Sequence, residues 1–164
     1  MFVRTASERD LAAINALLVT TWHDTYDSIY GVDKVNEITE VWHAVPVLQE
    51  RIEQPNAEFI VADTGEQICA VAFASSEDDD TVLKLHQLYV LPQCQGRGLG
   101  GLLLTEIMNC FPDAKRIRLE VEEANLSAVA FYESMGFAET GRTANCGRSD
   151  SGIPALIFER DLLG

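Results

Sequence analysis

A glycine-rich turn is the part of this sequence whose residue types and spacing most clearly allow chemistry. Gly96, Gly98 and Gly100 alternate within Gln95–Gly100, after a proline and before an apolar run. Glycine lets a backbone adopt positive φ and approach a ligand closely, and the N–H groups at a helix start favour an anion. Arg97 would add a charge-assisted contact. The turn therefore predicts a phosphate site.

Two familiar nucleotide-binding turns fit this segment less well. A dinucleotide-binding fingerprint needs its glycines after the first strand of a βαβ unit, whereas here they lie mid-chain, after strands that look antiparallel. A Walker A motif needs Gly-Lys-Ser or Gly-Lys-Thr, which the sequence lacks. A nucleotide-binding enzyme stays an alternative, as does a glycine-rich connection that binds nothing.

A second segment, Leu119–Phe137, combines an amide with a phenol. Asn125 precedes a helix-forming stretch, where asparagine is a favoured N-cap, and Tyr132 follows seven residues later. Seven residues make about two helical turns, so both side chains lie on nearly the same face and could line one ligand. Alternatively, Asn125 only caps the helix and Tyr132 is a core tyrosine.

Both segments resemble the GNAT superfamily of N-acetyltransferases. Gln95–Gly100 matches its Q/R-x-x-G-x-G/A signature, Leu88–Pro92 resembles the strand end before it, and Leu119–Phe137 resembles its second acyl-CoA block. The resemblance covers nearly the whole chain and is weakest over residues 20–56. It implies one GNAT-like domain over residues 1–164, with an α/β fold whose mixed, largely antiparallel sheet has about seven strands flanked by about four helices.

The same resemblance implies acetyl-CoA as the cosubstrate, without a metal. The turn would hold the pyrophosphate, Asn125 would contact the pantetheine or phosphate arm, and backbone groups near Leu88–Val90 would align the pantetheine and polarise the thioester carbonyl. The residues implied to bind the cosubstrate are Leu88, Tyr89, Val90, Gln95, Gly96, Arg97, Gly98, Leu99, Gly100 and Asn125. A non-catalytic acyl-CoA-binding sensor with this fold is the alternative to an enzyme.

Direct attack of an amine on the thioester requires that the amine lose a proton to a side chain or a water. The resemblance makes Tyr132 the general acid that protonates the CoA thiolate. Glu120 is the first candidate base, because ribosomal-protein alanine acetyltransferases have a matching Leu-Glu-Val segment five residues before the Asn. Those enzymes usually continue with Arg, where this chain has Glu122. His86 is the other candidate base, although a lone histidine in a strand is more often structural.

The acceptor is expected to be an amine of a small molecule or of a protein N-terminus. Trp22–Gly31 mixes aromatic rings with Asp24 and Asp27, and such a wall suits a cationic amine. It suits helix packing or a homodimer surface equally well. The net charge of −14 argues against a nucleic-acid partner and favours a cationic one.

The overall composition is that of an ordinary globular protein. Of the 164 residues, 47% are hydrophobic, yet no apolar run approaches the ~20 residues of a membrane span, and the N-terminus lacks the features of a signal peptide. Four cysteines are scattered without a C-x-x-C pair, which argues against a zinc or dithiol site. We expect a cytoplasmic protein, with Cys69 and Cys110 in the core and Cys94 open to solvent.

Hydrophobic patterning predicts the elements that position these residues. Strands are expected at Phe2–Thr5, Ala57–Asp63, Gln67–Ser75, Thr81–Leu91, Arg116–Glu122, Phe137–Thr143 and Ile153–Arg160. Helices are expected at Glu8–Thr20 (capped by Ser7 with Asp10), Val35–Ile52 (broken by Pro46), Gly98–Phe111 and Asn125–Met135, with Trp22–Tyr30 a helix or loop. The buried side of the last helix is expected to hold Leu126, Val129, Ala130 and either Tyr132 or Phe131.

Overall fold

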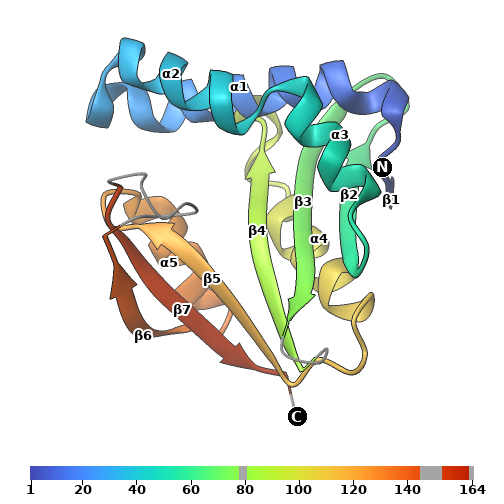
Figure 1. The fold of residues 1–164 in the computed structure, drawn as a ribbon, viewed down its shortest axis with the longest axis vertical. Coiled ribbons are helices and arrows are strands. Elements are labelled where there is room, and N and C mark those ends of the chain that lie inside the picture. Colours follow the sequence, from blue (N-terminus) through green and yellow to red (C-terminus); the bar gives the residue numbers. More distant parts are fainter. Residues whose placement is uncertain (78–80, 145–152, 163–164) are drawn as a thin grey trace. The chain divides into compact units, whose positions relative to one another are not determined.

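The computed structural model describes residues 1–77, 81–144 and 153–162, and these residues form seven strands and five α-helices (Figure 1). In chain order the elements are β1 (Phe2–Thr5), η1 (Glu8–Asp10), α1 (Leu11–Tyr30), α2 (Val32–Trp42), α3 (Val45–Glu53), β2 (Ala57–Asp63), β3 (Ile68–Glu77), β4 (Val82–Val90), η2 (Pro92–Cys94), α4 (Leu99–Asn109), β5 (Arg116–Glu122), α5 (Leu126–Ser134), β6 (Ala138–Thr143) and β7 (Ala155–Asp161). The elements labelled η are single 3₁₀ turns.

The strands form one mixed sheet in the order β1-β2-β3-β4-β5-β7-β6. The pairs β1–β2, β5–β7 and β6–β7 are antiparallel. β4 and β5 pair in parallel, over Val82–Leu85 and Arg116–Leu119. The expected α/β fold with a mixed, seven-stranded sheet is thereby confirmed. The described helices number five because the stretch predicted as one broken helix consists of two, α2 and α3.

The chain divides into two compact units. The first comprises Met1–Phe73 and Gln87–Ile107, and the second comprises Ala74–His86 and Met108–Gly164. β3 and β4 each contribute residues to both units. The first unit therefore holds the glycine turn, and the second holds Glu120, Asn125 and Tyr132.

α1 supplies a long buried face to the first unit. Ile14, Leu18, Trp22 and Tyr26 recur every four residues along it and are all buried, as expected for the core-facing stripe of a helix. The stripe continues past the predicted helix end at Thr20. The segment Trp22–Tyr30, for which a helix or a loop was expected, is therefore helical. A glycine with φ of 88° ends α1, in the backbone conformation that glycine adopts without strain.

The break predicted at Pro46 falls between α2 and α3. Pro46 lies in the first turn of α3, where the N–H that proline lacks would have no helical acceptor in any case. The backbone N–H of His43 still donates to the carbonyl of Thr39 at 3.0 Å. The proline therefore starts a second helix instead of kinking a single one.

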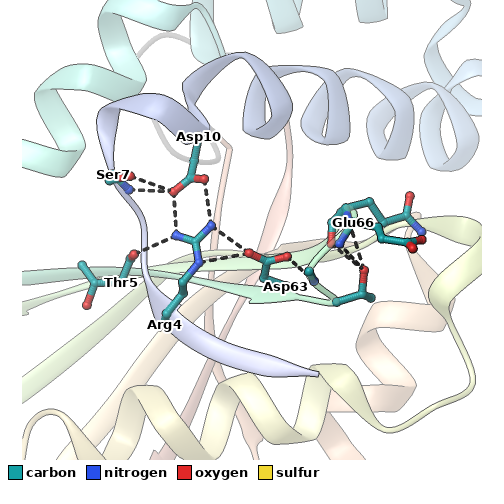
Figure 2. Close-up of polar contacts among 9 residues, drawn as sticks. Arg4, Thr5, Ser7, Asp10, Asp63 and Glu66 are labelled. Atoms are coloured by element: carbon teal, nitrogen blue, oxygen red, sulfur yellow. Dashed lines mark hydrogen bonds and ion pairs between the residues drawn. The ribbon is translucent and has the colours of Figure 1, made fainter.

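Arg4 ties three neighbouring segments of the first unit together (Figure 2). Its guanidinium donates to the Asp10 carboxylate at 2.8 and 2.9 Å and to Asp63 at 3.0 Å. The Ser7 N–H donates to the same Asp10 carboxylate at 2.9 Å, which confirms the predicted cap. The hydrogen bonds from Arg4 lower the pKa of Asp10 to about 2, so this carboxylate is ionised over the whole neutral range.

The second unit is organised around β5, which pairs with β7 along its whole length, while β6 pairs with the other edge of β7 (Figure 1). Ile117, Leu119 and Val121 are buried on one face of β5, as period-2 alternation predicts. α5 ends at Ser134 with Met135 as its C-cap, and Gly136 follows with φ of 90°, the left-handed conformation usual just after a helix.

Predictions about individual side chains were wrong in two places. Leu126 is 74% exposed and Ala130 is also exposed, so neither belongs to the buried side of α5. Helical side chains lean toward the N-terminus, so Leu126, in the first turn, projects beyond the end of its helix. Cys69 is in the core, as expected, but the expectations for the other two described cysteines were wrong: Cys94 is buried in contact with Cys69, and Cys110 is exposed just after α4.

Candidate active site

The glycine turn of the first unit has free space beside its backbone. β4 ends at Val90, and α4 starts at Leu99 after the single turn η2. Gly96 and Gly98 have φ values of 82° and 76°, which other residues rarely adopt. A Cβ at either position would meet no heavy atom within 4 Å. The glycines are therefore needed for backbone conformation, and the space beside them is not filled by protein.

The start of α4 supplies donors that have no helical acceptor. The N–H of Leu102 donates to the carbonyl of Gly98 at 3.0 Å, so the N–H groups of the three residues between them precede the helical ladder. Arg97 is exposed, and Leu99 is buried, so the helix is anchored while the cation faces solvent. Such a turn can hold an anionic group.

The turn is tied back to the strand that precedes it. The exposed Gln95 donates from Nε2 to the carbonyl of Val90 at 3.1 Å. Leu88, Tyr89 and Val90 are all half-buried, and the Tyr89 ring meets His43 edge-on at 6.4 Å between centroids. The structure thus brings the strand-end residues and the turn residues predicted for cosubstrate binding together in one unit.

Asn125 is the N-cap of α5. Its Oδ1 accepts from the N–H of Ala128 at 3.2 Å, and its own N–H donates to the carbonyl of Glu122 at 3.0 Å. The capping prediction is therefore confirmed. The contact of Asn125 with a cosubstrate stays a prediction.

Tyr132 is buried in the second unit, with 8% of its surface exposed. Its ring packs edge-on against Phe131 and Phe137, at 5.1 and 5.5 Å between centroids. Burial raises the pKa of the phenol above its ordinary value, and the Glu122 carboxylate raises it further. Tyr132 therefore keeps its proton at neutral pH, as a general acid must.

Glu120 is half-buried on β5, opposite Ile157 of β7. It lies between the buried Leu119 and Val121, so it projects from the other face of the strand, as predicted. Glu122 shares that face and is itself buried, at 7% exposed. Glu122 also raises the pKa of Tyr132, an effect that the sequence alone did not predict. The spacing of two residues between Glu120 and Glu122 was the available signal that they share a face.

His86, the alternative base, is exposed and is held by a neighbouring strand. Its Nε2 lies 2.7 Å from the hydroxyl of Ser75, which is buried on β3. A histidine with a fixed hydrogen-bond partner can be structural or catalytic. The geometry within this unit therefore keeps both Glu120 and His86 as candidate bases.

Comparison with known proteins decides the family. The family model for the acetyltransferase (GNAT) domain matches residues 27–154. This chain belongs to the GNAT acetyltransferase family. The match includes both the glycine turn and the segment from Leu119 to Phe137, which carried the resemblance.

Relatives and solved structures agree with the GNAT assignment. N-alpha-acetyltransferase RimI of Mycobacterium tuberculosis is 37% identical over 78 residues, which make up 48% of each chain. The chain thus matches about half the length of that relative. PaiA N-acetyltransferase from Thermoplasma acidophilum, solved in complex with coenzyme A, has a TM-score of 0.85 at 19% identity over 98% of both chains. Ribosomal-protein-alanine N-acetyltransferase from Brucella melitensis has a TM-score of 0.70 at 22% identity, covering 99% of this chain and 100% of that one. These structural likenesses show the fold.

The aromatic segment of this GNAT protein is mainly a packing element. Trp22 and Tyr26 are buried, with ring centroids 4.4 Å apart, so they do not form an open wall for an amine. Asp27 lies 2.6 Å from the ring of His23, and Asp24 is exposed. Of the alternatives left open for this segment, helix packing accounts for the buried positions of Trp22 and Tyr26.

The described residues offer no metal site and no membrane-spanning helix. No group of three or more His, Cys, Asp or Glu side chains there could hold a metal ion. Residues 78–80 of the acidic turn lie outside the described part of the chain, as does Cys146. Among the described helices, none combines the length and the apolar character that crossing a membrane would require.

Proposed function

We propose that this GNAT protein transfers an acetyl group from acetyl-CoA to a primary amine of a small molecule or of a protein N-terminus. The observation that carries the proposal is the open, positive-φ turn at the start of α4. Family membership supports acetyl transfer, and a structural neighbour was solved with coenzyme A. The name of RimI, an N-alpha-acetyltransferase, supports including protein N-termini among the acceptors.

The donor half of the proposed site is the turn with its preceding strand. Backbone N–H groups of Gln95–Gly100 bind the pyrophosphate, and Arg97 adds a charge-assisted contact. Backbone groups of Leu88–Val90 align the pantetheine and polarise the thioester carbonyl. Asn125 contacts the pantetheine or phosphate arm in addition to capping α5.

The proposed reaction is direct transfer. The amine nitrogen attacks the thioester carbonyl, a C–N bond forms, and the C–S bond breaks to release the CoA thiolate. Tyr132 gives its phenolic proton to that sulfur, and the phenol holds this proton at neutral pH before the thiolate forms. Glu120, or a water beside it, takes the proton that the amine loses. His86 is the alternative base.

An acetyl-transfer screen over a panel of amines tests this function. The panel comprises polyamines, aminoglycosides, amino acids and peptides with free N-termini, and the readouts are thiol release and the mass of the acetylated product. We expect release that depends on the amine for at least one class. Binding of acetyl-CoA without turnover on any amine would instead favour an acyl-CoA sensor. Tight binding of ATP or NAD, without binding of acetyl-CoA, would favour a nucleotide enzyme.

A further inference from the structure

Cys69 and Cys94 form a pair of thiols beside the donor turn. Cys69 lies on β3, Cys94 ends η2 immediately before Gln95, and both belong to the first unit. Their Sγ atoms are 2.8 Å apart, and their residues are 0% and 1% exposed. A disulfide bond measures about 2.05 Å, so the two sulfurs need to approach by less than about 1 Å to become bonded.

The backbones that carry the two thiols are already held together through Leu91. The N–H of Leu91 donates to the carbonyl of Cys69 at 2.9 Å, and the N–H of Cys94 donates to the carbonyl of Leu91 at 2.9 Å. The pair therefore owes its position to backbone hydrogen bonds and not only to side-chain rotamers. Because the two backbones are held in this way, closing the S–S bond also pulls on the segment that carries Cys94.

We propose that Cys69 and Cys94 are an oxidation site, at which a peroxide converts the two thiols into a disulfide that alters the donor turn. In the first step one thiol loses its proton and the thiolate attacks a peroxide oxygen; the O–O bond breaks, and the hydroxide that leaves takes up the proton, which gives a sulfenic acid and one water. In the second step the other thiol attacks the sulfenic sulfur, the S–S bond forms, and a second water leaves. Two thiols and one hydrogen peroxide thus yield one disulfide and two waters.

The surroundings of the pair make this oxidation slow. Burial, together with the hydrogen bond to Cys94, raises the pKa of Cys69 to about 11, against a weaker opposing effect of Arg97. This shift leaves very little Cys69 thiolate at neutral pH, which makes Cys69 a poor attacking group for the peroxide. Because both sulfurs are buried, the peroxide reaches them only when the structure around them opens. A ligand bound in the turn is expected to slow the reaction.

The expected effect of the Cys69–Cys94 disulfide on acetyl-CoA binding rests on the proposed function. Closing the bond draws Cys94 toward β3, and Gln95–Gly100 follows directly in the chain. Cys94 is joined to that turn without an intervening residue, so the shift changes the backbone that would hold the pyrophosphate. The disulfide form is therefore expected to bind acetyl-CoA several-fold more weakly than the dithiol form.

Peptide mapping of the full chain after peroxide treatment tests the oxidation site. A Cys110→Ser, Cys146→Ser background keeps the other two thiols from cross-linking, and wild-type protein is treated in parallel. We expect a Cys69–Cys94 cross-linked peptide that dithiothreitol removes and that is absent from a Cys94→Ala variant. The proposal is overturned if Cys69 and Cys94 remain thiols in folded wild-type protein after prolonged peroxide treatment, well beyond the time at which the exposed Cys110 is fully oxidised.

Calorimetric titration with acetyl-CoA tests the effect on the turn. The oxidised protein is expected to bind several-fold more weakly, with full recovery after reduction, whereas peroxide leaves the affinity of Cys94→Ala unchanged. Equal affinity of the disulfide and dithiol forms would refute control of the turn. If the reduced protein does not bind acetyl-CoA at all, the proposed function fails, while the mapping result still decides the oxidation site.

Discussion

At the scale of single residues, Tyr132 shows how the surroundings of a side chain set its chemistry. The sequence places a phenol two helical turns after Asn125, and the position of Asn125 before the helix was enough to predict its capping role. The raised pKa could not be predicted from the spacing, because it depends on how completely the ring is buried and on the carboxylate of Glu122 on β5. The resulting neutral phenol suits a proton donor.

Replacing Tyr132 with Phe is expected to lower kcat tens-fold or more, because the phenolic proton is lost while the ring and its packing remain. The affinity for acetyl-CoA should stay nearly unchanged. Steady-state kinetics with an active amine, together with calorimetric binding, measure the two effects separately. Ser134→Ala, an exposed change on the same helix, is the control. Wild-type kcat in Tyr132→Phe across the pH range would remove this residue from the mechanism.

At the scale of elements, the strands were more predictable than the helices. β2 and β5 have the predicted bounds, because each is a compact run of β-forming residues with a clear stop. α1 extends ten residues beyond its predicted end at Thr20, since the following aromatic rings pack by tertiary contact and not by a clear local pattern. The residues of the turn η2, in which Cys94 is buried, show no hydrophobic pattern that would predict the turn.

Asp10 is expected to be important for the stability of η1 and the start of α1. Asp10→Ala removes both the cap to Ser7 and the ion pair with Arg4, and hydrogen bonds to charged groups contribute about 1.5–3 kcal/mol each. We expect chemical denaturation to show a loss of about 2 kcal/mol, and acetyl-CoA affinity to be unchanged. Asp24→Ala, at an exposed position, should have little effect. Equal stability of the two variants would contradict the role of the cluster.

The junction of α2 and α3 is expected to be sensitive to acid through His43. This ring is 1% exposed and its Nε2 has no hydrogen-bond partner in the described structure. Burial, with a smaller effect of Arg51, lowers the pKa of His43 to about 3, from about 6.5 in the unfolded chain. The unfolded state therefore binds the proton more tightly, and the stability due to His43 is present above pH 6.5 and is lost as the pH falls toward 3.

Urea denaturation between pH 7 and pH 4 measures this effect. Below pH 6.5 the wild-type protein is expected to lose up to about 1.4 kcal/mol per pH unit because of His43. A His43→Phe variant lacks that contribution, so its free energy of unfolding should fall less steeply over the same range. Parallel curves for the two proteins would contradict the account of a neutral, buried imidazole.

At the scale of the whole chain, the composition restricts the class of partner more than it restricts the reaction that the protein catalyses. The net charge of −14 disfavours nucleic acid and attracts cations, but it does not identify the amine. The single-domain organisation, the cytoplasmic location and the homodimer stay predictions. The fold class and the family were accessible from two short motifs in the correct order, whereas the acceptor was not, because the motifs describe only the donor side.

Ionic strength is expected to affect turnover in a direction that reports the charge of the acceptor. For a cationic amine, kcat/KM should fall several-fold when salt is raised from about 20 to about 300 mM, because screening weakens long-range attraction. A neutral amine of similar size serves as the control and should show little change. A rise of kcat/KM with salt for the cationic amine would contradict electrostatic attraction by the acidic chain.

The central claim, that acetyl-CoA is held at the glycine turn, is tested most directly by calorimetric titration of two glycine variants. Gly98 and Gly65 both have positive φ, 76° and 96°, and neither position would bring a Cβ within 4 Å of another atom. Valine at either position strains the backbone to a similar degree, but only Gly98 belongs to the turn. We predict that Gly98→Val abolishes acetyl-CoA binding in a folded protein, whereas Gly65→Val binds like the wild type. Retained affinity in folded Gly98→Val would contradict the assignment.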